Sequence, residues 1–286
     1  MIILTIKQLF DTQKKRLANF LDSESEAAQT LLIIFENIKG WSMTDILVRG
    51  DDAASDFVIQ QIEQAVNKVL AGEPVQYVFG KAHFYGLILN VSPATLIPRP
   101  ETAELVDLIV DKYKGDSDLK VFDIATGSGC IAVALARNLP FSEVDAIDIS
   151  DKALEVAKSN NELLHTNVNF YNGDILSLKK TESPIYDVIV SNPPYIARSE
   201  ANEMSNVVLD HEPDIALFVP DDDPLKFYKP ISIYAVNALK PGGTLYFEIN
   251  PLFADELKKF MMKQPWESVD IVRDMQRNNR FIIAIK

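Results

Sequence analysis

The fold of this chain is decided by the stretch Asp187-Val188-Ile189-Val190-Ser191-Asn192-Pro193-Pro194-Tyr195-Ile196, in which an apolar run meets a polar residue, two prolines and an aromatic ring. A continuous β-branched run is typical of a strand whose two faces are both covered by helices. Neither Pro193 nor Pro194 can donate a hydrogen bond to a neighbouring strand, so the strand must end there. The stretch therefore predicts a stiff loop at the carboxyl end of a buried strand, where open α/β sheets bind ligands.

The residues of this loop offer two hydrogen-bond acceptors and a flat ring. Asn192 has a side-chain carbonyl, Pro193 has a backbone carbonyl with no N–H of its own to compete, and Tyr195 has an apolar face. Together they could hold a planar group that bears an NH2. The plainer alternative is a strand followed by a tight turn, because Asn and Pro are ordinary turn residues. The full sequence Asn-Pro-Pro-Tyr after such a strand favours the binding loop.

Composition and charge exclude several classes of protein. The chain has 286 residues, 47% of them hydrophobic and 24% charged, which suits two domains with substantial cores. No apolar run approaches the roughly 18 residues of a membrane-spanning helix, so we expect a cytoplasmic protein without a membrane partner. The single cysteine, Cys130, and three scattered histidines offer no metal-ligand spacing, so no metal is expected. A net charge of −13 argues against stable nucleic-acid binding and favours a protein or small-molecule substrate.

The first part of the chain is predicted to be a small helical bundle, residues 1–74, because apolar residues recur there at helical spacing. It carries no catalytic constellation, and we expect it to recognise a substrate protein. Residues 75–97 are predicted to form a β-hairpin linker, with strands at residues 77–79 and 87–89. The proline-rich residues 92–100 are read as a linker or lid that enters the second domain.

Residues 98–286 are predicted to form the catalytic domain, because strand and helix patterns alternate there and alternation implies a parallel sheet. The expected strands are residues 120–124, 144–149, 168–171, 186–191 and 244–249; the expected helices are residues 101–113, 130–138, 151–164, 225–239 and 254–264. Residues 269–272 and 281–285 are close enough in sequence to form a hairpin, which would add one antiparallel strand. The pattern predicts an α/β, Rossmann-like fold.

A glycine-rich loop follows the first of these strands, in the sequence Asp123-Ile124-Ala125-Thr126-Gly127-Ser128-Gly129-Cys130. Glycines let the backbone approach a ligand closely, and the helix that follows presents unpaired N–H groups to it. Asp148 ends the next strand, 21 positions after Gly127, where an acid can accept both hydroxyls of a ribose. The pattern predicts a nucleoside-containing cofactor, with a structural turn and a capping acid as the alternative.

Two kinds of cofactor are compatible with this loop. Its Gly-x-Gly-x-x-Ala pattern could bind a dinucleotide, which would make the protein a dehydrogenase. The C-terminal hairpin favours S-adenosylmethionine instead. So does Asp174, which follows Gly173 directly after the third strand and can bracket an adenine, although alone it would be read as a turn residue.

The sequence as a whole resembles one known family. The resemblance rests on residues 72–77, residues 93–102, the loop around Gly127, the Asn-Pro-Pro-Tyr loop, and Arg273-Asp274 with Asn279-Arg280. In these segments the chain is similar to the HemK/PrmC family of release factor glutamine methyltransferases, over nearly its whole length. The resemblance implies a class I S-adenosylmethionine-dependent methyltransferase fold with a helical N-terminal domain. It also implies methyl transfer to the side-chain amide nitrogen of the glutamine in the Gly-Gly-Gln motif of class 1 peptide-chain release factors, with S-adenosylhomocysteine as the product.

The resemblance also assigns site residues. The cofactor-binding residues that it implies are Asp123, Ala125, Thr126, Gly127, Ser128, Gly129, Asp148, Asp174, Ile175 and Asn192. The substrate amide would be held by Asn192, Pro193, Pro194 and Tyr195, with Asn192, Pro193 and Tyr195 in catalytic roles, and Asp123 would lie near the amino group of the cofactor. Ala125 stands where a glycine is common, and its Cβ is expected to impose a conventional backbone angle. Ile175 stands where some relatives carry an aromatic residue. A monomer is expected.

The implied chemistry is positioning. An amide nitrogen is a poor nucleophile because its lone pair is delocalised; acceptance of both N–H hydrogens by Asn192 and Pro193 would orient it and favour the charge that builds up on it. Tyr195 would pack on the amide plane, and no general base is needed. One rival is a methyltransferase that acts on the exocyclic amine of adenine in DNA or RNA. The other is a non-catalytic S-adenosylmethionine-binding module for translation factors. The acidic charge weighs against the first, and the complete Asn-Pro-Pro-Tyr loop disfavours the second.

Overall fold

In the computed structural model, which describes residues 4–177 and 185–286, the chain divides into two units. The helical unit comprises Met1–Gly80 together with Asn206–His211, and the sheet unit comprises Lys81–Ser205 and Glu212–Lys286. Within the described residues, no helix combines the length and apolar character that crossing a membrane would require.

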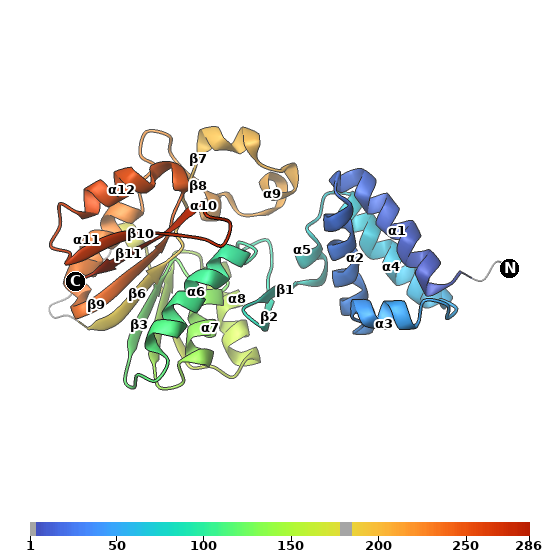
Figure 1. Ribbon diagram of the computed structural model, residues 1–286, viewed down its shortest axis with the longest axis horizontal. Helices are drawn as coiled ribbons and strands as arrows, with labels where there is room; N and C mark the ends of the chain where they lie inside the picture. The colour runs from blue at the N-terminus through green and yellow to red at the C-terminus, as the bar shows by residue number, and fades with distance from the viewer. Residues whose placement is uncertain (1–3, 178–184) are drawn as a thin grey trace. The chain divides into compact units, whose positions relative to one another are not determined.

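The helical unit is built around amphipathic helices whose apolar faces meet in one core. Its helices are α1 (Ile6–Leu21), α2 (Glu24–Lys39), α3 (Met43–Val48), α4 (Asp56–Leu70) and α5 (Val75–Phe79), joined in the same unit by α9 (Asn206–His211). Each of the first four helices is capped at its N-terminus by a Thr or Ser side chain that accepts a hydrogen bond from a backbone N–H of the first turn. These capping residues are, in order, Thr5, Ser23, Ser42 and Ser55. In Figure 1 the helices α1 to α4 are drawn in shades of blue, α5 in teal and α9 in gold. The helical prediction for this region is confirmed.

The predicted first strand of the hairpin is wrong. Residues 77–79 lie in the helix α5, which follows Pro74 and ends at Gly80 in a left-handed conformation (φ 65°). Side chains of α5 pack on the core of the helical unit, and this tertiary burial outweighs the strand propensity of an aromatic and β-branched run. The hairpin instead pairs β1 (Lys81–Phe84) with β2 (Leu87–Asn90) in antiparallel register.

The sheet unit contains a seven-stranded sheet in the order β10-β11-β9-β6-β3-β4-β5. Its strands are β3 (Lys120–Ile124), β4 (Glu143–Asp148), β5 (Val168–Asn172), β6 (Tyr186–Ser191), β9 (Leu239–Glu248), β10 (Ser268–Arg273) and β11 (Asn279–Ile285). The five strands from β9 to β5 are mutually parallel, and β11 is antiparallel to both of its neighbours. The predicted parallel sheet with one antiparallel strand is confirmed, and β3 and β6 match their expected bounds.

Helices cover both faces of the sheet. Helices α6 (Pro100–Tyr113), α7 (Cys130–Asn138) and α8 (Asp151–Leu163) lie on one face, and α11 (Tyr228–Ala238) and α12 (Ala254–Met261) lie on the other (Figure 1). The side chains of Val188 and Val190 pack in the core under α6 and α7, and that of Ile189 packs in the core under α11 and α12. All three are fully buried. The β-branched run Val188–Val190 is therefore covered from both sides, as expected for a central parallel strand.

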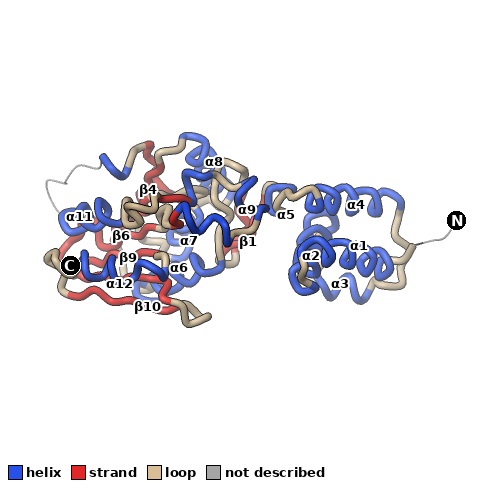
Figure 2. Tube along the Cα trace, turned by 90° about the horizontal axis from the view of Figure 1, so that it is seen from above, coloured by secondary structure: helices blue, strands red, loops and turns tan. Residues whose placement is uncertain are grey.

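Short elements follow the carboxyl ends of the parallel strands. They are the 3-10 turns η1 (Ile175–Ser177), η2 (Arg198–Glu203) and η3 (Pro251–Phe253), the helix α10 (Asp214–Leu217), and the two-residue strands β7 (Ile196–Ala197) and β8 (Phe218–Val219). Strands β7 and β8 pair in parallel, so the chain beyond Tyr195 is held beside the segment that precedes α11. In Figure 2 the strands of the main sheet, in red, lie between the blue helices.

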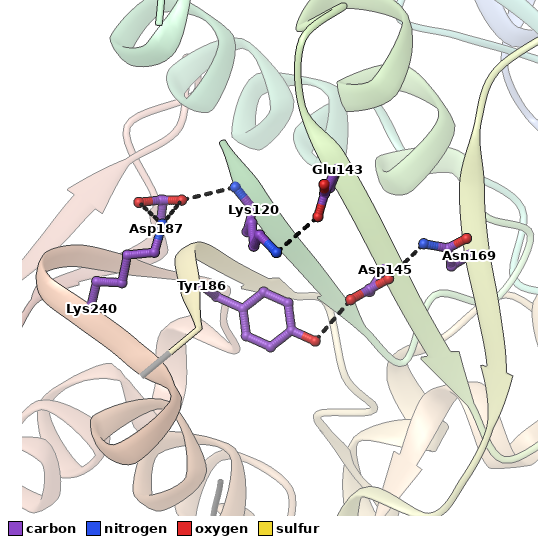
Figure 3. A network of polar contacts seen from close by, with 7 residues as sticks. All are labelled: Lys120, Glu143, Asp145, Asn169, Tyr186, Asp187 and Lys240. Atoms are coloured by element: carbon purple, nitrogen blue, oxygen red, sulfur yellow. Dashed lines mark hydrogen bonds and ion pairs between the residues drawn. The ribbon is translucent and has the colours of Figure 1, made fainter. Parts of the chain in front are cut away.

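A network of polar side chains closes the opposite edge of the sheet, where β3, β4 and β6 begin (Figure 3). Asp145 accepts hydrogen bonds from the Tyr186 hydroxyl at 3.0 Å and from Asn169 Nδ2 at 2.9 Å. Asp187 pairs with Lys240 at 2.7 Å and accepts from the backbone N–H of Lys120 at 2.8 Å. These contacts tie the amino ends of the parallel strands together. Ligands of open α/β sheets bind at the other end, beyond the carboxyl ends of the strands.

Candidate active site

The two loops singled out in the sequence lie side by side because β3 and β6 are adjacent parallel strands. The Ser191 hydroxyl, at the end of β6, donates to the backbone carbonyl of Ile124 at the end of β3, at 2.7 Å. The chain leaves β3 into the glycine-rich loop and leaves β6 into the Asn-Pro-Pro-Tyr loop. Two segments far apart in sequence thereby share one edge of the sheet.

A cavity of about 280 Å³ opens at this edge, within the sheet unit. Its volume is near the lower end of the roughly 300–1,000 Å³ that is usual for small-molecule sites. Ten of the residues predicted for the site line its wall, namely Ala125, Thr126, Gly127, Ser128, Asp148, Asp174, Ile175, Asn192, Pro193 and Pro194. Asp123, Gly129 and Tyr195 do not line it. The structure thus brings most of the predicted cofactor and substrate residues to one cavity.

The glycine-rich loop is shaped by left-handed backbone conformations. Gly127 (φ 56°) would place a Cβ in open space, whereas a Cβ at Gly129 (φ 77°) would come within 3.0 Å of Ala157 Cβ. Gly127 therefore leaves room beside the cavity, and Gly129 lets α7 approach α8 closely. The expectation of a conventional backbone angle at Ala125 is wrong, because its φ is 61°. The turn imposes the conformation for which glycine is usual, and the alanine adopts it under strain.

Asp148 joins the loop to the end of β4. Its Oδ2 accepts from the backbone N–H of Gly127 at 2.8 Å, and its Oδ1 accepts from that of Ser150 at 2.9 Å. Burial raises the pKa of this carboxyl, while the two backbone donors oppose the shift. Each oxygen keeps a lone pair that can accept a further hydrogen bond, so the carboxylate can take the two hydroxyls of a ribose.

Asp123 lies behind the cavity wall. It is fully buried, and the Thr126 hydroxyl donates to its Oδ2 at 2.6 Å. Its Oδ1 has no hydrogen-bond partner in the described part of the chain, and burial raises the pKa of the carboxyl to about 7. A buried acceptor without a hydrogen-bond partner, such as this oxygen next to a residue of the cavity wall, suits a cationic amino group. The contact between Asp123 and a cofactor stays a prediction, since Asp123 does not line the cavity, whereas Thr126, which donates to it, does.

Part of the cavity wall is apolar. Ile147, Ile149 and Ile175 line it, and Asp174 lies beside them with its Oδ1 accepting from the backbone N–H of Leu176 at 2.8 Å. A Cβ at Gly173 would come within 2.6 Å of Ile147 Cδ1, so any other residue at this turn would require the isoleucine side chain to shift. Branched apolar side chains flanked by one carboxylate suit a flat heterocycle with an amino group at its edge.

Asn192 is held by residues that sequence reasoning did not assign to the site. Its Nδ2 donates to Thr102 Oγ1 at 3.1 Å, and the Thr102 hydroxyl donates to Glu248 Oε2 at 2.7 Å. The Tyr195 hydroxyl donates to the other oxygen of Glu248, at 3.1 Å. The predicted role of Tyr195, packing on the amide plane, does not require its hydroxyl, and the structure shows that this hydroxyl contacts Glu248. The stacking of its ring on a substrate amide stays a prediction.

Comparison with known proteins identifies the family of the chain. Residues 10–80 match the PrmC N-terminal domain, and residues 103–210 match the methyltransferase small domain. The release factor glutamine methyltransferase of Bacteroides thetaiotaomicron is 41% identical over 95% of this chain and 96% of its own length. The chain belongs to the release factor glutamine methyltransferase family. The proteins of that name from Flavobacterium psychrophilum and Streptococcus pneumoniae are 38% and 36% identical, over 93% and 98% of this chain and 94% and 98% of their own lengths.

Solved structures of other methyltransferases share the fold of this member of the release factor glutamine methyltransferase family. A methyltransferase from Pyrococcus furiosus has a TM-score of 0.51 at 20% identity, over 79% of this chain and 98% of its own. The hMettl16 catalytic domain has a TM-score of 0.54 at 18% identity, over 70% of this chain and 75% of its own. At these identities the likeness concerns the fold alone, which is that of the class I S-adenosylmethionine-dependent methyltransferases.

The segment read as a linker or lid also lines the cavity of this methyltransferase, through Thr95, Leu96 and Pro98. Its position is fixed by Glu212, a buried acid whose carboxylate accepts from the backbone N–H of Ile97 at 3.1 Å and pairs with Arg99. The proline spacing indicated an irregular segment at this place. The acid that holds it lies 115 residues from Ile97, which no local pattern reveals.

Proposed function

We propose that this protein transfers a methyl group from S-adenosylmethionine to the side-chain amide nitrogen of the glutamine in the Gly-Gly-Gln motif of class 1 peptide-chain release factors. The observation that carries the proposal is the single cavity lined both by the glycine-rich loop, through Thr126–Ser128, and by Asn192 and Pro193. A methyl donor held by the first loop and an amide held by the second would meet there. Family membership, which includes the PrmC N-terminal domain, supports a release factor as the substrate.

The residues present fit S-adenosylmethionine. Asp148 offers carboxylate oxygens for the ribose, Asp174 and the isoleucines suit the adenine, and the unpartnered Oδ1 of Asp123 suits the amino group. When bound, this cofactor supplies an electrophilic methyl group on a sulfonium sulfur, and S-adenosylhomocysteine is the product that leaves.

Asn192 and Pro193 would orient the substrate amide. The Asn192 side-chain oxygen and the Pro193 backbone carbonyl can each accept one hydrogen of the NH2 group, which fixes the direction in which its nitrogen faces. Both acceptors also favour the positive charge that grows on that nitrogen, so the site acts by electrostatic preorganisation. Our hypothesis is that the amide proton leaves to solvent after transfer.

The helical unit would recognise the release factor outside its Gly-Gly-Gln loop. The unit has its own core and needs none of the cavity residues, and its match to the PrmC N-terminal domain supports this role. We further propose that the protein acts as a monomer in the cytoplasm, where release factors act.

The test is methylation of a purified class 1 release factor with isotopically labelled S-adenosylmethionine, followed by mass spectrometry of the Gly-Gly-Gln peptide. We expect one labelled methyl group on the glutamine, and none on a release factor in which that glutamine is replaced by alanine. Label that appears on DNA or RNA, with none on the glutamine, would overturn the proposal in favour of an adenine methyltransferase. Binding of the release factor without transfer would favour a non-catalytic module.

A further inference from the structure

Four side chains form a continuous chain of hydrogen bonds that begins at the cavity wall. The chain runs from Asn192 Nδ2 to Thr102 Oγ1, from Thr102 to Glu248 Oε2, and from Glu248 Oε1 to the Tyr195 hydroxyl. Thr102 and Glu248 are 2% and 1% exposed, so water does not compete for these bonds. Of the four residues, Asn192 and Thr102 line the cavity. The chain therefore connects a buried acid to the cavity surface.

The direction of each hydrogen bond in this chain is fixed by chemistry. A carboxylate only accepts, so the single hydrogen of the Thr102 hydroxyl points to Glu248. The hydroxyl can then only accept from Asn192, which must turn its NH2 group toward Thr102. Within the described residues this is the only side-chain hydrogen bond of Asn192, and its Oδ1 is left for a ligand.

The orientation of the Asn192 amide decides whether it can hold a substrate amide. With Oδ1 toward the ligand, it offers an acceptor to an incoming NH2 group. Rotated by half a turn, it would offer its own NH2 group, and two donors would face each other. The two orientations have nearly the same shape, so packing alone cannot select between them.

Each oxygen of the buried Glu248 carboxyl accepts a hydrogen bond from a hydroxyl group. Burial raises the pKa of this carboxyl, but the Thr102 and Tyr195 donors and the charge of Arg280 oppose that shift. Arg280 is itself held by the buried Asp274, at 3.3 Å from Nε to Oδ2. Arg280 and Asp274 come from the C-terminal segments that resemble the family, to which the resemblance assigned no role. Arg280 supplies a positive charge that acts on Glu248, and Asp274 holds Arg280 in place.

We propose that Thr102 and Glu248 are positioning residues that fix the amide of Asn192 with its oxygen toward the substrate, an assignment that rests on the proposed glutamine methylation. Neither residue needs to touch the reacting atoms. Their effect is on how the substrate amide is oriented, so they should influence turnover more than cofactor affinity or folding.

The test compares two substitutions at Thr102. Thr102→Val keeps the shape of the side chain and removes the hydroxyl, whereas Thr102→Ser keeps the hydroxyl. We expect Thr102→Val to lower kcat for release factor methylation by on the order of 10- to 100-fold, the loss found when a hydrogen bond that orients a metal ligand is removed, because Thr102 orients Asn192 in the same way. Thr102→Ser should recover kcat to within about threefold of the unsubstituted enzyme, and S-adenosylhomocysteine affinity measured by calorimetry should change by less than about threefold in both.

A matched control is available on β9. Thr244 is also fully buried, and its hydroxyl accepts from Lys112 Nζ at 2.9 Å and the Tyr113 hydroxyl at 3.0 Å, so Thr244→Val removes a buried hydroxyl away from the cavity. It should lower the unfolding temperature without lowering kcat. An equal loss of kcat in Thr244→Val and Thr102→Val would show a purely structural effect and overturn the proposal, as would full activity of Thr102→Val.

A second readout keeps the positioning proposal separate from the proposed function. In the protein labelled with ¹⁵N, the side-chain NH2 resonances of Asn192, assigned by their loss in Asn192→Ala, should move in Thr102→Val and stay in place in Thr102→Ser and Thr244→Val. This measurement needs no methyl acceptor. Failure of the unsubstituted enzyme to methylate release factor would contradict the proposed function alone, while unchanged Asn192 resonances in Thr102→Val would contradict the positioning role alone.

Discussion

The backbone N–H of Gly127 donates to Asp148 Oδ2 at 2.8 Å, which fastens the loop after β3 to the acid that ends β4. We expect Asp148→Ala to weaken S-adenosylmethionine binding by roughly 1.5–3 kcal/mol, or about 10- to 100-fold, because hydrogen bonds to charged groups contribute about that much. Calorimetric titration measures the change. The control is Asp145→Ala on the same strand, which loses the bonds of Tyr186 and Asn169 at the opposite edge and should lower stability while leaving cofactor affinity unchanged.

Ala125 carries a Cβ in a left-handed conformation (φ 61°). Such a conformation costs about 1–2 kcal/mol, whereas the entropy cost of a glycine is about 0.5–1 kcal/mol. Ala125→Gly should therefore raise the free energy of unfolding by up to about 1 kcal/mol, as measured by urea denaturation. A destabilised Ala125→Gly protein would show that the alanine methyl group contributes more by packing than it costs in strain.

The stability of the protein should depend on the protonation of Asp123. Its pKa is raised from 3.8 to about 7, so the folded state binds the proton more tightly than the unfolded state does. The stability that this group contributes is fully present below about pH 4 and is lost as the pH rises through about 7. Urea denaturation should show Asp123→Asn gaining stability relative to the unsubstituted protein by up to about 4 kcal/mol between these pH values. A constant difference across this range would contradict the raised pKa.

Asn192→Ala should strongly reduce methyl transfer while largely preserving cofactor binding. Loss of one preorganised hydrogen-bonding group in an active site lowers kcat by about 100- to 1,000-fold. We expect the affinity for S-adenosylhomocysteine to fall by less than about tenfold, because Asp148 and the glycine-rich loop remain. Asn169→Ala serves as the control, since it removes an asparagine amide from the opposite edge of the sheet. Unchanged turnover in Asn192→Ala would remove Asn192 from the mechanism.

Much of the sheet unit could be predicted because its signals are local. The strands β3 and β6 and the helix α7 have the expected bounds, since β-branched runs, glycines and prolines mark their ends directly. The same local reasoning failed at residues 77–79, where packing against the helical core converts a strand-like run into α5. It also failed at Ala125, where the turn dictates the backbone angle and the residue type does not.

The support of the site was not predictable because its contacts are long-range. Asn192 and Thr102 are 90 residues apart, and Thr102 and Glu248 are 146 apart. The residue types of the Asn-Pro-Pro-Tyr loop themselves indicate a ligand site. The residue that orients Asn192 is a threonine near the start of α6, and nothing in the sequence around it indicates that role. An acid that ends a buried apolar run, as Glu248 does after Leu245–Phe247, was the available signal, because a charged side chain in that position requires partners.

The strand β6 has different tasks at its two ends. Tyr186 and Asp187 anchor its start, and the chain that leaves Ser191 carries the proposed amide-binding residues. Substitutions at the start of β6 that raise stability would lie the length of the strand away from the cavity. A search for a more robust enzyme could therefore target the starting edge of the sheet, where we expect substitutions to change stability while leaving catalytic efficiency unchanged, and so avoid the usual trade-off between stability and activity.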